Sequence, residues 1–79
     1  MSDESKSELV EGRYANYFKV GYNAFEFLFD FGQCYQDNDT VQANIRIITA
    51  PVYAKGLLDT LKASIEQYES MHGAISKDP

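Results

Sequence analysis

With 79 residues and a mass of 9.0 kDa, the chain has room for one domain. It is 44% hydrophobic, too apolar for a wholly disordered protein, and it has no apolar run near the roughly 18 residues of a membrane helix. Its net charge of −5 disfavours a nucleic-acid partner. The polar start without a secretory signal and the single cysteine, which cannot form an internal disulfide, together predict a cytoplasmic protein.

The composition changes near Gly12. Residues 1–12 hold four acidic side chains against one lysine and few apolar groups, so burial cannot offset the entropy of ordering them. We therefore predict an acidic disordered tail over 1–12, a single domain over 13–73 and a short C-terminal tail over 74–79.

The domain opens with two segments of period-two patterning. Residues 13–21 alternate as a strand does, and Gly21 with Asn23 predicts a tight hairpin turn over 21–24. In 25–31, four phenylalanines alternate with Glu26, Leu28 and Asp30, which places the phenylalanines on one face of a second strand.

A third strand is expected at 41–49, after a turn over 36–40. The Asp37-Asn38-Asp39 run resembles the start of a calcium loop, but the positions that need Gly and Glu carry Gln42 and Ile48, so the turn is the better interpretation.

The period changes at Pro51, which is suited to the first turn of a helix with Thr49 or Ala50 as its cap. Gly73 is suited to end it. Gly56 lies inside this helix, where it either allows a close approach or is tolerated on the exposed side. The helix carries an apolar stripe at spacings of 4, 3, 4, 3 and 4, made of Ala54, Leu58, Leu61, Ile65, Tyr68 and His72.

These elements predict an α+β fold, a three-stranded antiparallel meander followed by one long amphipathic helix packed on the sheet (βββα). A folded block of about 60 residues buries only some 60% of its unfolded surface, and three strands leave two open edges. We therefore expect a homodimer or larger assembly, joined through a continuous sheet or paired helices.

Candidate interaction or ligand residues are few. Lys19, Glu26 and Arg46 share with Asp30 the sheet face opposite the phenylalanines, where cross-strand ion pairs are expected. Tyr14 and Asn16 stand out because asparagine is poorly suited to an apolar strand face. We expect no catalytic, cofactor or metal residues.

His72 and Cys34 have ordinary structural interpretations. His72 is the only histidine, near the end of the helix, where it interacts with the helix dipole or completes the apolar stripe. Cys34 is expected to be a small semi-buried residue at a strand end.

A series of short motifs resembles a family of short prokaryotic proteins known as a domain of unknown function. The resemblance covers residues 12–73 and implies a stand-alone cytosolic protein, with no activity or catalytic residue to carry over. The motifs are Gly12-Arg-Tyr-Ala-Asn-Tyr-Phe, Glu26-Phe, Asp30-Phe, Arg46-Ile-Ile-Thr, Pro51, Ala54-Lys, Leu57-Leu, Ile65-Glu-Gln-Tyr-Glu and Gly73.

The order of elements is also similar to that of the protein-export chaperone SecB, which is longer, has a fourth strand and a second helix, and assembles as a tetramer. The leading hypothesis is accordingly a non-enzymatic, homo-oligomeric protein-interaction module, chaperone-like in one form. The alternative is a small-ligand or enzymatic site formed between subunits from Tyr14, Asn16, Arg46 or His72.

Overall fold

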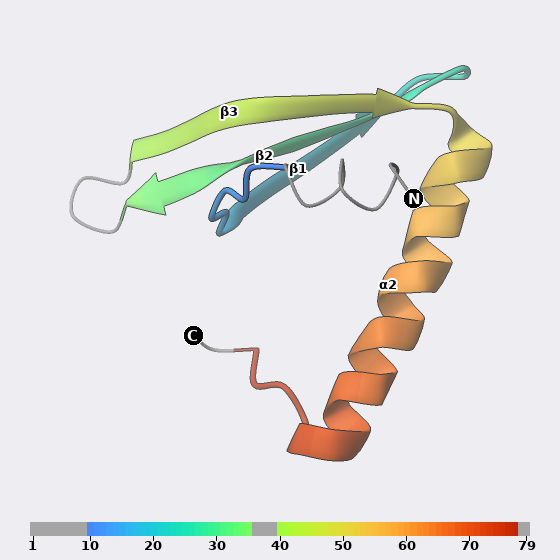
Figure 1. The fold of residues 1–79 in the computed structure, drawn as a ribbon. Helices are drawn as coiled ribbons and strands as arrows, with labels where there is room; N and C mark the ends of the chain where they lie inside the picture. The colour runs from blue at the N-terminus through green and yellow to red at the C-terminus, as the bar shows by residue number, and fades with distance from the viewer. Residues whose placement is uncertain (1–9, 36–39, 78–79) are drawn as a thin grey trace. The chain divides into compact units, whose positions relative to one another are not determined.

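The structure is a computed structural model that describes residues 10–35 and 40–77. Its elements are β1 (Tyr17–Tyr22), β2 (Phe27–Tyr35), β3 (Thr40–Thr49) and α2 (Pro51–His72). The strands form one antiparallel sheet in the order β1-β2-β3, so β2 is central and β1 and β3 are the edges (Figure 1). The predicted α+β, βββα fold is confirmed.

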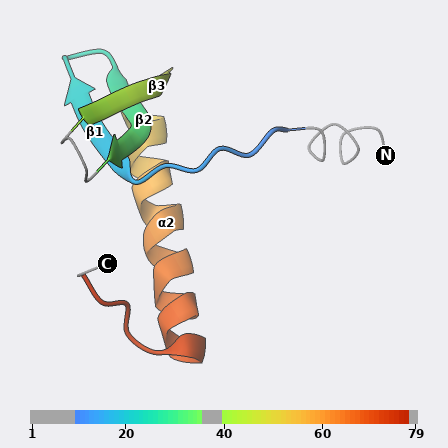
Figure 2. The same cartoon turned by 90° about the vertical axis from the view of Figure 1, so that its left-hand side faces the viewer.

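These elements fall into two compact units. The first holds residues 10–20, 29–35 and 40–47, which make most of the sheet. The second holds residues 21–28, which form the tip of the first hairpin, and residues 48–77, which contain α2. Figure 2 gives a second view of the three strands and the helix.

The turn of the first hairpin lies at 23–26, two residues later than the sequence predicts. Asn23 sets it, because its Oδ1 accepts hydrogen bonds from the backbone N–H groups of Phe25 and Glu26 at 2.7 and 2.9 Å. Phe25 is part of this Asx-turn and is 81% exposed. The second strand therefore begins at Phe27 rather than at Phe25, and Gly21 lies inside β1 instead of in the turn.

Gly32 lies where the backbone of β3 closely approaches β2. A Cβ at this position would overlap the carbonyl oxygen of Gln42 and lie 2.6 Å from Cα of Ala43. Both neighbours are backbone atoms that cannot swing aside, so the pairing of these strands requires glycine here.

The sheet has an aromatic face. Phe18 and Phe31 meet edge to face at 5.9 Å between ring centroids, and Tyr22 stacks on Phe27 at 5.6 Å. Phe29 lies between Phe27 and Phe31 on the same side of β2 by strand alternation, and all three are half-buried.

Within the described part of the chain no hydrophobic side chain is buried. A sheet with one apolar face gains its stability by covering that face, and three strands curl too little to cover it themselves.

The helix has the predicted boundaries. Ala50, in extended conformation, precedes it as the N-cap, and Pro51 takes the first helical position. Gly73 ends it with a positive φ of 92°, and its N–H donates to the carbonyl of Glu69 at 2.9 Å. No residue of α2 is buried.

Three sequence predictions fall wholly or partly outside the described residues. These are most of the acidic tail over 1–12, the turn over 36–40 and the end of the C-terminal tail.

Candidate functional site

An ion pair joins the two strands that make the second hairpin. The side chain of Asp30, in the middle of β2, accepts two hydrogen bonds from Arg46 on β3, from Nε to Oδ1 at 2.7 Å and from Nη2 to Oδ2 at 2.9 Å. The pairing is bidentate, which fixes the guanidinium plane as well as its distance. The Asp30 side chain is only 11% exposed, whereas the Arg46 side chain is 60% exposed.

This geometry shifts both groups toward their charged forms. The hydrogen bonds from Arg46 hold the pKa of the Asp30 carboxyl below its ordinary value, against the opposing effect of burial and with further help from the positive charges of Arg46 and Lys19. The hydrogen bond to Asp30 in turn raises the pKa of Arg46. Both side chains therefore stay ionised at neutral pH.

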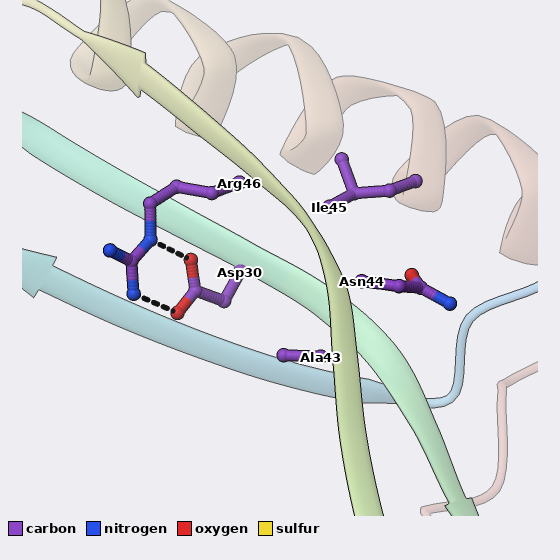
Figure 3. Close-up of a pocket in the computed structure, with 5 residues that line it drawn as sticks. All are labelled: Asp30, Ala43, Asn44, Ile45 and Arg46. Carbon is purple, nitrogen blue, oxygen red and sulfur yellow. Dashed lines mark hydrogen bonds and ion pairs between the residues drawn. The ribbon is translucent and has the colours of Figure 1, made fainter.

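A shallow hollow of about 330 Å³ opens beside this ion pair. It is lined by Asp30, Ala43, Asn44, Ile45 and Arg46, so β3 supplies most of its wall. Figure 3 shows the guanidinium of Arg46 turned toward Asp30, while Ile45 projects on the other side of β3. The carboxylate of Asp30 accepts hydrogen bonds from Nε and Nη2 of Arg46, so the charges of these two side chains offset each other beside the hollow.

Of the four charged residues predicted to share one sheet face, the structure brings three together. Asp30 pairs with Arg46, as cross-strand pairing predicts, and Lys19 is close enough to act on the charge of Asp30. Glu26 is not in a strand. It closes the Asx-turn through its backbone and lies outside the ion pair.

Asn16 has a structural role. Its Oδ1 accepts from the backbone N–H of Cys34 at 2.9 Å, and its Nδ2 donates to the carbonyl of the same residue at 3.4 Å. Its own N–H donates to the carbonyl of Gly32 at 3.0 Å. The amide thus imitates a backbone unit and continues the β1–β2 pairing past the start of β1.

Tyr14 is held through its main chain, and its ring is exposed. The Tyr14 carbonyl accepts from Nε2 of Gln33 at 3.4 Å, and Oε1 of Gln33 accepts from the hydroxyl of Tyr35 at 2.5 Å. Neither Tyr14 nor Asn16 lines the hollow beside Arg46.

The remaining chemistry-bearing side chains lie apart. The His72 ring contacts Tyr68 one turn earlier at 4.8 Å between centroids, and Cys34 is an exposed thiol. Cys34 was expected to be semi-buried, and that expectation is wrong. The described residues contain no group of three or more histidine, cysteine, aspartate or glutamate side chains able to hold a metal ion.

The helix stripe is an exposed apolar surface of the second unit. Leu58 and Leu61, at its centre, are 56% and 53% exposed. The same side of the helix continues through residues that are also exposed, namely Leu57, Ile65, Tyr68 and Met71. Contiguous apolar surface of this kind marks interaction sites in folded proteins.

Asp30 is the site residue that sequence reasoning undervalued. It was placed on the charged face but not among the candidates, although an acidic side chain between two phenylalanines in a strand is a visible signal that a partner cation is needed. Ala43, Asn44 and Ile45 carry no comparable signal, because their place around the hollow depends on how β3 pairs with β2.

No helix among the described residues is long and apolar enough to cross a membrane.

Comparison with known proteins gives one match. A family model described as "Protein of unknown function (DUF3467)" matches residues 2–77. No curated protein and no solved structure matches the chain, so the likeness to SecB has no support from these comparisons. Since the match spans nearly the whole sequence, the chain belongs to the DUF3467 family of proteins of unknown function.

Proposed function

We propose that this protein is a non-enzymatic protein-interaction module that works in the cytoplasm as a homodimer or larger assembly. One observation carries the proposal. The described part of the chain has an aromatic sheet face and an apolar helix stripe, and it buries no hydrophobic side chain. Folded proteins are only about 5–15 kcal/mol more stable than their unfolded chains, and burial of apolar surface is the main source of that margin.

A second copy supplies the missing cover. Each buried leucine- or phenylalanine-sized side chain contributes about 1.5–3 kcal/mol, so covering a few residues of either surface offsets a large part of the folding entropy. No internal disulfide contributes, because the chain has one cysteine. Oligomerisation is the usual remedy for a small domain in this position.

The edges of the sheet provide a further surface for protein partners. Among the strands that the structure describes, none covers the outer side of β1 or of β3. An extended segment of another protein could pair with either edge through backbone hydrogen bonds, which is the chaperone-like form of the proposal.

The alternative, a ligand or enzymatic site formed between subunits, has less support. Both atoms of the Asn16 amide bond to the backbone of Cys34, and Arg46 is neutralised by Asp30. These contacts give structural roles to the residues on which that alternative depended most.

Light scattering coupled to size exclusion, at micromolar concentration, tests the proposal. We expect a mass of at least twice the 9.0 kDa of one chain. Leu61→Gln, in the centre of the helix stripe, should lower the mass on dilution, whereas Ala63→Gln, on the opposite side of the helix, should leave it unchanged. A folded species of monomer mass that survives dilution would overturn the proposal.

A further inference from the structure

The two flanks of the helix stripe differ in character, and this difference bears on how a second copy docks. With 100° between successive residues, the stripe is bordered on one side by Lys55, Lys62 and Glu69. The other border holds Leu57, Ser64 and Met71. The helix therefore has one charged border and one that is apolar or small.

We propose that α2 binds α2 of a second copy in antiparallel orientation, with Ser64 near the two-fold axis. This inference rests on the proposed function and specifies its interface. In an antiparallel pair, the charged border of one helix faces the charged border of the other, and the apolar borders also face each other. A parallel pair would instead place each charged border against an apolar one, which costs desolvation without a partner charge.

The order of charges along the helix supports the same orientation. In the antiparallel register that pairs Leu61 with Ile65 of the partner subunit, Lys55 faces Glu69 of the partner subunit. Two-fold symmetry forms this pair twice. Lys62 lies near its own copy, and Asp59 and Glu66, three and four residues away on the same helix, offset its charge.

The apolar residues also match in this register. Leu57 faces Met71 of the partner subunit, and Leu58 faces Tyr68 of the partner subunit. At the ends of the contact Ala54 faces His72 of the partner subunit, so a small side chain meets a large one. The helix macrodipoles oppose each other, which favours the pairing electrostatically.

Gly56 and Ala63 lie on the side of the helix opposite the stripe. Nothing comes within 4 Å of a Cβ built on Gly56, in keeping with a face left to solvent. This side therefore provides control positions that no helix pairing through the stripe should bring together.

Cross-linking of the full chain tests the orientation. In a Cys34→Ser background, single substitutions Ser64→Cys, Leu57→Cys, Met71→Cys and Ala63→Cys are each treated with a short bis-maleimide. We expect Ser64→Cys to link to itself. Leu57→Cys and Met71→Cys should link only when the two variants are mixed, because like positions lie about 21 Å apart along an antiparallel pair (14 residues at 1.5 Å). Ala63→Cys should not link.

The outcomes separate this inference from the proposed function. Self-linking by Leu57→Cys and Met71→Cys would show a parallel pair and overturn the orientation. A dimer mass with no cross-link at any of these positions would overturn the helix interface and leave the homo-oligomer in place. A monomer mass would overturn both.

Charge exchange gives a second readout that does not depend on cross-linking. Lys55→Glu and Glu69→Lys should each raise the dissociation constant of the dimer roughly two- to tenfold, and the double variant should recover most of the loss. Gln67→Lys adds a positive charge on the side of the helix opposite the stripe and serves as the control. Failure of the double variant to recover would contradict the antiparallel register.

Discussion

At the scale of single residues, Gly32 has the strictest requirement in the sheet. Adding a methyl group there forces overlap with backbone atoms of β3, whereas nothing lies within 4 Å of a Cβ at Gly21 in β1. Two glycines in neighbouring strands thus differ in the space around them, which their identity alone does not reveal.

We predict that Gly32→Ala lowers the free energy of unfolding by at least about 1–3 kcal/mol, which is the typical cost of overpacking that forces the backbone to shift. Gly21→Ala should be neutral or slightly stabilising, since it removes backbone entropy from the unfolded chain. Urea unfolding followed by circular dichroism measures both. Equal stability of the two variants would contradict the close approach of β2 and β3.

Because of the Asp30–Arg46 pair, we expect the free energy of unfolding to decrease as the solution becomes acidic. Because the folded protein lowers the pKa of Asp30 below its unfolded value, this residue stabilises the fold fully above about pH 4. The contribution is lost as pH falls through the lowered pKa, when the carboxyl takes up a proton and the pair with Arg46 breaks.

We therefore expect the free energy of unfolding to fall more steeply below about pH 4 in the parent protein than in Asp30→Asn, since the variant has no carboxyl to protonate at this site. Urea titrations from about pH 2 to pH 7 measure the slopes. Parallel curves for the parent and Asp30→Asn would exclude a stabilising role for the pair.

At the scale of elements, the helix was the most predictable part of the chain. Pro51 and Gly73 mark its ends in the sequence and in the structure, because the first has no N–H to lose and the second adopts a positive φ. Its 22 residues also carry an apolar repeat that no strand would produce.

The two glycines of this helix segment should respond in opposite ways to alanine. Gly56→Ala should stabilise the protein by about 1 kcal/mol, because it removes backbone freedom at an open position in the helix interior. Gly73→Ala should destabilise it, since its φ of 92° strains any residue with a side chain. Thermal unfolding at fixed protein concentration measures both, and a loss of stability in Gly56→Ala would indicate a close contact on that side of α2.

The strands were predicted in type and order but less well in position. Alternating phenylalanines correctly indicate β2, yet Phe25 belongs to the turn because the side chain of Asn23 takes two backbone N–H groups. The same sequence pattern suits a turn at 21–24 or at 23–26.

At the scale of the whole molecule, sequence reasoning gave the fold class and, of the residues that line the hollow, named only Arg46 as a candidate. That Asp30 would need a cation was readable from its place between phenylalanines, and Arg46 was one of two cations expected on its face. The hollow was not predictable, because it depends on the register of β3 against β2. Asn16 was singled out correctly as unusual, but its purpose is to bond to the main chain of Cys34.

The contacts of Asn16 have a consequence for misfolding. The side-chain amide of Asn16 hydrogen-bonds both the N–H and the carbonyl of Cys34, and so stands at the end of the hydrogen-bond ladder between β1 and β2. A strand that slid by one residue would lose these hydrogen bonds and turn its phenylalanines to the opposite side. The Asn16 amide therefore favours the native register of β1 against β2.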